Sequence, residues 1–297
     1  MNTEKILQAG KIASQVRTFA EKLIKPDISL LEIAEKIESK IEELGGKPAF
    51  PVNLSINNIA AHYTPSHNDE TVAHGLLKID FGVHVDGWVA DTAFSIDLEN
   101  NEENKKLIQA AEDALQAATD FVAKNLRGGR VGTLSQIGAT IQETIEGQGF
   151  SPIINLSGHS MEQHELHAGI TVPNIDDERK IKLEEGLYAI EPFSTTGSGK
   201  VHDGSQSGIY ILVEERAPRS PTAREVLEFI AENYQTLPFC SRWIVKALGS
   251  KALFGLRELE KNGNLHQFAQ LVESPGSKVA QAEHTILVDK EVKITTE

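Results

Sequence analysis

Residues 75–96, GLLKIDFGVHVDGWVADTAFSI, predict a β-hairpin around which the rest of the chain is interpreted. Two apolar-rich segments flank the dipeptide Asp86-Gly87, and both of these residues tolerate the positive φ of a two-residue turn. A turn there sets Gly82 opposite Asp91, so Asp80 lies diagonally across from Asp91 on one face. Diagonal neighbours are about 7–8 Å apart in their backbones and closer in their side chains. The hairpin is therefore expected to hold two carboxylates side by side.

The opposite face of the hairpin is expected to be an apolar layer that packs on a core. It would consist of Ile79, Phe81, Val83, Val85, Trp88, Ala90, Phe94 and Ile96. Two adjacent carboxylates repel each other, and they need solvation, a shared proton or a cation. Solvation is the ordinary explanation for two aspartates on the polar face of a sheet, so the hairpin alone does not indicate a metal site.

Composition and charge limit the classes of function. The 297 residues are 40% hydrophobic and carry 29 basic against 43 acidic side chains, a net charge of −14. An acidic protein is a poor partner for nucleic acid or an anionic membrane, which bind basic patches. The single cysteine, Cys240, excludes an internal disulfide, and the N-terminal segment has no apolar core of a signal peptide. We expect a cytoplasmic protein without a membrane span.

Helical periodicity surrounds the hairpin. A first helix is expected over residues 3–23, and a second begins at Ser29 with a capping box completed by Glu32 and stops at Gly45-Gly46. An extended segment then delivers His62, which by itself is more typical of a core histidine than of a catalytic one. A long amphipathic helix follows over residues 104–126.

The chain then repeats this pattern. Residues 29–55 and 133–157 share three isoleucines at helical spacing, glycines, a proline and the tripeptide NLS. GLLKID (75–80) resembles GLYAIE (186–191), and VADTAFSI (89–96) resembles QAEHTILV (281–288), which aligns Asp80 with Glu191 and Asp91 with Glu283. Chance similarity of short apolar strings is the competing explanation. A duplicated α+β fold with a pseudo-two-fold axis would bring four carboxylates to one cleft, where they require cations.

The second half contains an insertion. Its two aligned acids are 92 residues apart, against 11 in the first half. Much of the extra chain has helical periodicity, at residues 222–234, 241–248 and 254–261, before the extended segment HQFAQLVES. We expect an inserted helical subdomain over about residues 211–272, on the rim of the cleft.

The segment NLSGHSMEQHELHAGI adds His159 and His167. HELH is one residue shorter than the HExxH motif of zincins, and TGSGKV (196–201) lacks the serine or threonine of a P-loop, so both interpretations are rejected. One histidine with four carboxylates forms a mostly oxygen site, suited to two divalent ions of Mn, Co, Fe or Zn. The four negative charges would balance two dications.

These motifs together resemble those of the type 2 methionine aminopeptidases of archaea and eukaryotes. The resemblance rests on KIDFGVHVDGWVADTAF, NLSGH, HAGI, YAIEPF, QAEHT and AAHYTP, and it covers nearly the whole chain. It implies a pita-bread fold, with residues 1–297 forming one catalytic domain and residues 211–272 the insertion of type 2 enzymes. The basic N-terminal extension of eukaryotic members has no counterpart here, so the archaeal form is expected.

The resemblance also implies roles for individual residues. A dinuclear metal centre would be ligated by Asp80, Asp91, His159, Glu191 and Glu283, with Asp91 and Glu283 bridging two divalent ions. A hydroxide held between the ions would attack the first peptide bond. Glu191 would carry the proton, and His62 and His167 would hydrogen-bond the scissile carbonyl and the tetrahedral intermediate. In this family the counterpart of His62 is the target of fumagillin-type epoxides.

The methionine pocket implied by the resemblance includes Phe50, Phe193 and Ile209, the last replacing a histidine of eukaryotic members. For the two phenylalanines, core packing is the competing explanation. An apolar slot of this kind discriminates by size, at about 1–3 kcal/mol per methylene.

The leading hypothesis is therefore removal of the initiator methionine from nascent chains whose second residue is small. Two alternatives remain: an Xaa-Pro dipeptidase of the same fold, and a non-catalytic relative that binds RNA or the ribosome. The AAHYTP motif and the absence of a further N-terminal domain disfavour the dipeptidase, and the acidic charge with all five ligand positions disfavours the binding module. The expected partners are nascent N-termini and, transiently, the ribosome; no stable nucleic-acid complex is expected, and the enzyme is expected to be a monomer.

Overall fold

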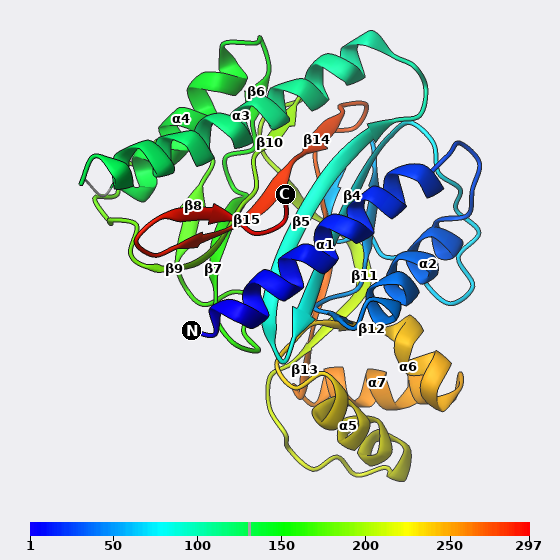
Figure 1. Ribbon diagram of the computed structural model, residues 1–297. Coiled ribbons are helices and arrows are strands. Elements are labelled where there is room, and N and C mark those ends of the chain that lie inside the picture. Colours follow the sequence, from blue (N-terminus) through cyan, green and yellow to red (C-terminus); the bar gives the residue numbers. More distant parts are fainter. Residues whose placement is uncertain (130–131) are drawn as a thin grey trace.

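A nine-stranded sheet forms the centre of the molecule in the computed structural model, which describes residues 1–129 and 132–297 (Figure 1). Its main path runs β1-β4-β5-β15-β9-β7-β8, with β2 also on β4 and β16 also on β15. All of its pairs are antiparallel. The strands are β1 (Lys47–Pro48), β2 (Asn53–Ile56), β4 (Leu76–Val85), β5 (Trp88–Asp97), β7 (Ser157–Met161), β8 (Thr171–Pro173), β9 (Gly186–Ile190), β15 (Glu283–Val288) and β16 (Val292–Ile294).

The hairpin expected from the sequence is the pair β4–β5, in the expected register. Gly82 pairs with Asp91, and the turn residues Asp86 and Gly87 have φ angles of 51° and 78°. The apolar face packs as expected, except at Trp88. This half-buried side chain lies beside the turn at the far end of the hairpin and packs against a separate cluster of buried residues that includes Ile6.

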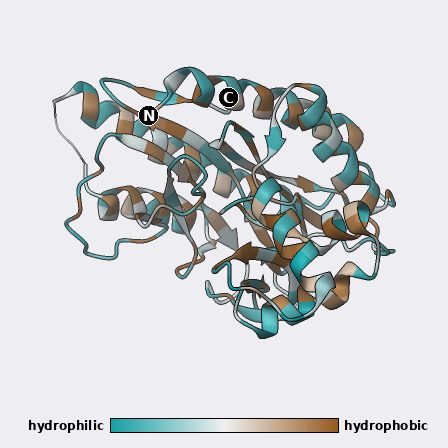
Figure 2. Ribbon diagram, turned by 90° about the horizontal axis from the view of Figure 1, so that it is seen from below, coloured by the Kyte–Doolittle hydropathy of each residue, from teal (hydrophilic) through white to brown (hydrophobic). Residues whose placement is uncertain are grey.

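Two pairs of helices cover the sheet, one pair for each half. Helices α1 (Thr3–Leu23) and α2 (Leu30–Glu43) share one core with β4 and β5, and α3 (Glu102–Arg127) and α4 (Leu134–Glu146) share another with β9 and β15. Their helical segments confirm the expected ones. Figure 2 shows hydrophilic and hydrophobic residues alternating along these helices, as amphipathic helices require.

The helix starts differ from expectation in one detail. At Ser29 only half of the capping box forms: the backbone N–H of Glu32 donates to Ser29 Oγ, while the Glu32 carboxylate binds Lys36 one turn later. The complete box is at the start of α4, where Thr133 and Gln136 bond reciprocally. The box at Thr133 was not predicted from the sequence.

The extra chain of the second half forms a helical layer and three strands of a second sheet, and the first half contributes the fourth strand. Helices α5 (Pro221–Asn233), α6 (Ser241–Leu248) and α7 (Ala252–Lys261) confirm the expected helical segments. They lie beside a four-stranded sheet of β3 (Ile59–Ala61), β11 (His202–Leu212), β12 (Phe239–Cys240) and β13 (Leu265–Val272). A third sheet contains β6 (Ser151–Pro152), β10 (Phe193–Thr195) and β14 (Val279–Gln281). The division at residues 211–272 into a separate subdomain stays a prediction. Within the described residues, no helix is long and apolar enough to cross a bilayer.

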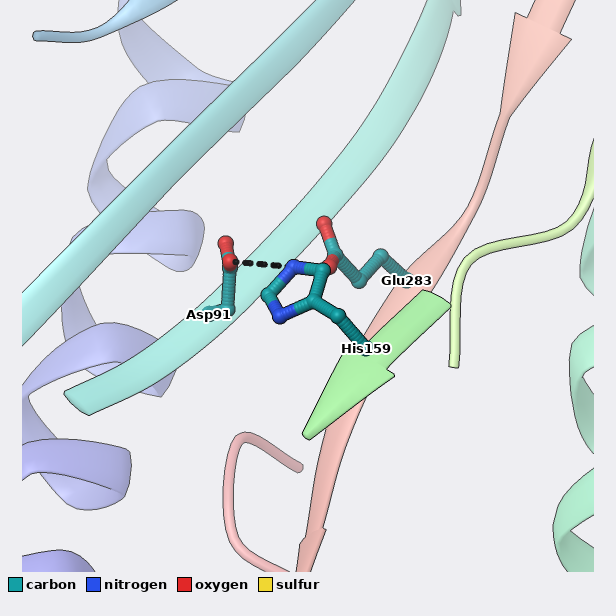
Figure 3. Close-up of side chains that lie close together, drawn as sticks. All are labelled: Asp91, His159 and Glu283. Atoms are coloured by element: carbon teal, nitrogen blue, oxygen red, sulfur yellow. Dashed lines mark ion pairs between the residues drawn. The ribbon is translucent and has the colours of Figure 1, made fainter. Parts of the chain in front are cut away.

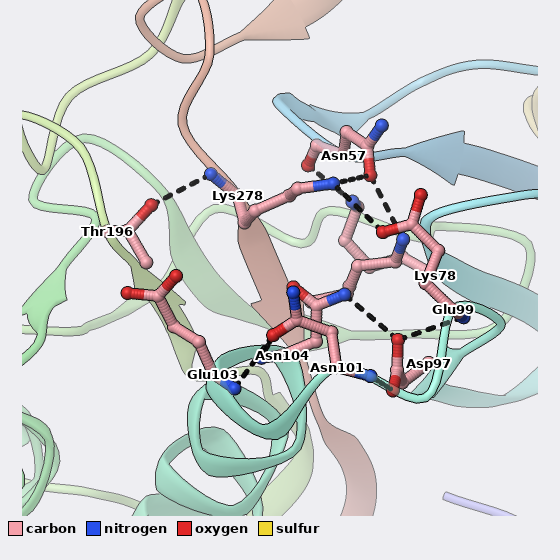
Figure 4. A network of polar contacts seen from close by, with 10 residues as sticks. Asn57, Lys78, Asp97, Glu99, Asn101, Glu103, Asn104, Thr196 and Lys278 are labelled. Atoms are coloured by element: carbon pink, nitrogen blue, oxygen red, sulfur yellow. Dashed lines mark hydrogen bonds and ion pairs between the residues drawn. The ribbon is translucent and has the colours of Figure 1, made fainter.

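A buried polar network joins the two halves (Figure 4). Lys78 of β4 is fully buried, and its ammonium donates to the carbonyl oxygens of Asn57 (2.8 Å) and Val279 (3.0 Å). Lys278 donates to Asn57 Oδ1 (2.7 Å) and lies 3.6 Å from Glu99. Burial lowers the pKa of Lys78, so its bonds to carbonyl oxygens are what stabilise the charged form. Backbone carbonyl groups from both halves thus accept hydrogen bonds from one buried lysine side chain.

Strand β7 approaches β9 so closely that Gly158 has no room for a side chain. A Cβ built at this position would lie 2.2 Å from the carbonyl oxygen of Ala189. The close approach places the next residue, His159, opposite Ala189 in the sheet. A backbone atom is the obstacle, so relaxation requires a movement of the strand.

We therefore expect Gly158→Ala to lower the free energy of unfolding by about 1–3 kcal/mol, the usual cost of overpacking. Gly128→Ala is the matched control, because a Cβ there meets no atom closer than 3.4 Å and φ is negative. Urea unfolding of both variants, followed by circular dichroism, measures the difference. Equal midpoints for the two variants would contradict the packing argument.

Candidate metal centre

Sheet register brings four acids to one place. Asp80 on β4 and Glu283 on β15 both pair with Ala93 of the strand between them, so the three residues form one rung. Asp91 lies two residues away on the middle strand and therefore projects from the same face. Glu191 directly follows β9, the strand on the other side of β15. Four carboxylates, three from adjacent strands and one from the end of a fourth strand, thus lie close together.

A histidine completes the group. His159 on β7 has its Nε2 atom 3.6 Å from Asp91 Oδ2 and 3.8 Å from Glu191 Oε1. One potential ligand atom from each of Asp91, His159 and Glu283 lies within 4.8 Å of the others, and all three side chains are buried (Figure 3). This spacing is suited to a single cation contacting all three.

Burial and mutual repulsion raise the pKa values of the acids. Burial raises the pKa of Asp80 from 3.8 to about 7. Burial, reinforced by the charge of Asp80, holds the pKa of Asp91 well above its ordinary value. The pKa values of Glu191 and Glu283 are raised well above normal, first by burial and then by the neighbouring carboxylates. Without cations the group would have to retain protons.

The donor set fits divalent cations. Asp91 Oδ1 is buried and has no hydrogen-bond partner among residues 1–129 and 132–297. Burial, reinforced by His167, lowers the pKa of His159 to about 3, so the ring is neutral and can offer a lone pair. Carboxylate oxygens with one imidazole suit first-row divalent metals. These residues therefore fit the metal site that the sequence predicts.

Two further histidines lie beside the acids. The ring of His167 makes an edge contact with that of His159, at a centroid distance of 4.4 Å, and burial lowers its pKa to about 4. His62 is held by a 3.1 Å hydrogen bond between its Nδ1 and the carbonyl oxygen of Ala269. A carbonyl can only accept, so Nδ1 carries the proton; burial lowers the pKa of this ring, which leaves Nε2 as an unprotonated acceptor.

One cavity of roughly 350 Å³ contains the whole predicted site. Its lining includes every candidate residue from the sequence: Phe50, His62, Asp80, Asp91, His159, His167, Glu191, Phe193, Ile209 and Glu283. Phe50, Phe193 and Ile209 are nearly completely buried, so they serve as packing as well as lining. Core packing and a pocket role coincide at these three positions.

Several further residues that line the cavity were not predicted from the sequence. Asn53 lies directly opposite Asp80 in the sheet, and Phe268 makes an edge contact with the ring of His62 at 5.5 Å. The alternation in HQFAQLVES could have indicated that Phe268 faces the cleft. Asn53 stood in the recognised NLS repeat, but nothing in the sequence placed it beside an acid.

The geometry agrees with what comparison with known proteins finds. The model of metallopeptidase family M24 matches residues 4–290. Methionine aminopeptidases of Pyrococcus abyssi and Methanocaldococcus jannaschii are both 46% identical to this chain; the first alignment covers 100% of each protein, the second 99% of this chain and 98% of the relative.

Solved structures show the same fold. A methionine aminopeptidase from Thermotoga maritima matches with a TM-score of 0.69 at 21% identity, over 100% of this chain and 98% of its own. A thermophilic Arx1 matches with a TM-score of 0.82 at 16% identity, over 99% and 91%. At these identities the likeness concerns the fold alone, and it confirms the pita-bread architecture with mixed helices and strands. From the family match and its relatives, the chain belongs to metallopeptidase family M24.

Proposed function

We propose that this protein is a methionine aminopeptidase that removes the initiator methionine from chains whose second residue is small. The observation that carries the proposal is the convergence of four carboxylates and one neutral imidazole in a cavity that is also lined by apolar side chains, among them Phe50, Phe193 and Ile209. Relatives that are 46% identical over nearly their full lengths are named methionine aminopeptidase. The charged part of the cavity supports hydrolysis and the apolar part supports methionine selection.

The proposal includes two divalent ions, of Co, Mn, Fe or Zn, since two dications would balance the four carboxylates. Asp80, Asp91, His159, Glu191 and Glu283 would hold them. When bound, the ions would polarise the scissile carbonyl and lower the pKa of the attacking water. Metal dependence follows from the metallopeptidase family; the number and identity of the ions belong to the proposal.

The side chains would share the proton transfers and the positioning of the substrate. Glu191 is the group proposed to take a proton from water and give it to the leaving amine, because its carboxylate lines the cavity at the end of β9. His167, beside His159, would hydrogen-bond the carbonyl oxygen and the tetrahedral intermediate. His62 presents an unprotonated Nε2, so we assign it to accept from the N–H of the scissile bond. In this tautomer Nε2 cannot donate, so His62 would not hydrogen-bond the scissile carbonyl as the sequence resemblance implied.

The pocket would select methionine by shape. Phe50, Phe193 and Ile209 line the cavity and expose almost no surface elsewhere. A flexible unbranched side chain fits such a slot, and each methylene gained or lost there is worth about 1–3 kcal/mol. The free α-amine would lie near the acids, which restricts cleavage to the first residue.

The proposed setting of the reaction is the cytoplasm, on N-termini of nascent polypeptides, with the ribosome as a transient partner. The net charge of −14 supports the absence of a stable nucleic-acid complex. A monomeric state is part of the same proposal.

Release of free methionine from a Met-Ala-Ser peptide tests the reaction. Protein stripped with a chelator is expected to be inactive and to regain activity when Mn or Co is added. An Xaa-Pro dipeptide serves as the control substrate and is expected to remain intact. Cleavage of that dipeptide without release of methionine under any metal would instead identify a dipeptidase.

The acids can be tested singly. Asp91→Asn is expected to lower kcat/KM for methionine release at least about a hundredfold, because the amide cannot balance the charge of the ions. Metal content after dialysis, measured by mass spectrometry, should fall in parallel. Asp289→Asn, an exposed aspartate at the end of β15, is the matched control and should behave as wild type. An Asp91→Asn enzyme with a near-normal rate would contradict the assignment.

The metal-free protein should lose stability as pH rises. The folded pKa of Asp80 is raised from 3.8 to about 7, so its contribution to stability is complete below about pH 4 and is lost as pH rises toward 7. The loss should be roughly 1–4 kcal/mol, at about 1.4 kcal/mol per pKa unit. Urea unfolding at pH 4.5 and 7.5, with and without metal, measures it. A stripped protein that is more stable at pH 7.5 would contradict the raised pKa.

A further inference from the structure

His62 adopts a backbone conformation that a histidine does not adopt freely. Its φ is 65°, in the left-handed region, at the end of β3 (Ile59–Ala61). Such residues persist only where the surroundings hold them, and they are concentrated at functional sites. Upstream, Ala61 pairs with Leu271 of β13, and the His62 ring is bonded to Ala269 of the same strand. These contacts fix one side of His62 only.

The downstream side is held by the residues that follow. Tyr63 accepts a 2.7 Å backbone bond from Leu54, and Thr64 Oγ1 donates to the carbonyl oxygen of Val52 (2.9 Å). Pro65 offers a carbonyl oxygen, which accepts a 3.0 Å bond from Arg242 Nε. Arg242 Nη2 also lies 3.3 Å from Thr64 Oγ1. An arginine of the inserted helix α6 therefore hydrogen-bonds the residues two and three positions after His62.

Arg242 is itself held in place by an acid from the first half. It is 2% exposed and forms a two-pronged pair with Glu38 of α2, at 2.6 and 2.8 Å. Glu38 also accepts from Trp243 Nε1 (2.9 Å) and from the backbone N–H of Val52 (3.4 Å). In Figure 1, α6 lies next to α2, where this pair joins them. The flat guanidinium binds both oxygens of Glu38 with two of its nitrogens while a third contacts Pro65, a planar fork that the compact ammonium of a lysine does not reproduce.

We propose that Arg242, oriented by Glu38, is a positioning residue that holds His62 in its left-handed conformation and aims its Nε2 into the cleft. The inserted helices would thus act on the reaction through the segment after His62, without touching the substrate. The inference rests on the proposed function where turnover is measured. The orientation of His62 can also be tested without turnover, by the reactivity of its Nε2 atom.

Two readouts test the proposal on the metal-loaded, full-length protein. The first is kcat and KM for methionine release. The second is the rate at which fumagillin alkylates His62, measured by peptide mass spectrometry. In this reaction the Nε2 lone pair opens the epoxide, and the resulting alkoxide takes a proton from water. Arg242→Lys is expected to lower kcat and the alkylation rate together, by about tenfold to a hundredfold, the cost of misplacing a reacting group. KM and bound metal should change little.

Two more variants make the result decisive. Arg224→Lys is the matched control, an exposed arginine on α5 of the same insertion, and should leave both rates unchanged. Thr64→Val keeps the shape and the Glu38–Arg242 pair while removing the hydroxyl, and should give a smaller loss in the same direction if Arg242→Lys fails to fold. Folded variants that alkylate His62 at the wild-type rate would overturn the proposal, whatever their stability. A wild-type protein that is alkylated but releases no methionine would refute the proposed function, and the variants' alkylation rates would still decide this inference.

Discussion

Repulsion among four carboxylates, two buried and two half-buried, is the constraint on which the rest of this structure depends. Asp80, Asp91, Glu191 and Glu283 come from both halves of the chain; burial raises the pKa of each, and neighbouring carboxylates raise the pKa values of the last three further. A fold that encloses such a group must receive cations or keep protons. The antiparallel sheet supplies rigid register, the helices bury its other face, and the cleft leaves the charged face accessible to ions and substrate.

Much of this arrangement could be predicted from the sequence, because it depends on local rules. The Asp86-Gly87 turn fixes the register of the hairpin, and the register fixes the diagonal of Asp80 and Asp91. The alignment of the two halves predicted that Glu191 and Glu283 join these acids; Glu283 does so at the start of β15, opposite Ala93, and Glu191 does so from the residue just past β9. The helical stretches of the insertion were also predictable from their apolar periodicity.

What could not be predicted depends on contacts between distant residues. Glu38 and Arg242 are 204 positions apart, and each alone is an ordinary charged residue on a helix. Lys78 alternates with apolar residues in a strand, yet its ammonium is buried against carbonyl oxygens from both halves. The tautomer of His62 depends on Ala269, a residue of the insertion's sheet. Sequence periodicity tells which face a residue occupies but not which distant group meets it.

Within the nine-stranded sheet, the pairing that joins the two halves is short. Strands β5 and β15 pair through Glu283 with Ala93 and His284 with Thr92, and the hydroxyls of Thr92 and Thr285 add bonds across it. Each half buries its own helices largely against its own strands. The acids become neighbours only when this pairing forms. The capacity to bind ions therefore depends on the pairing of the two halves rather than on either half alone.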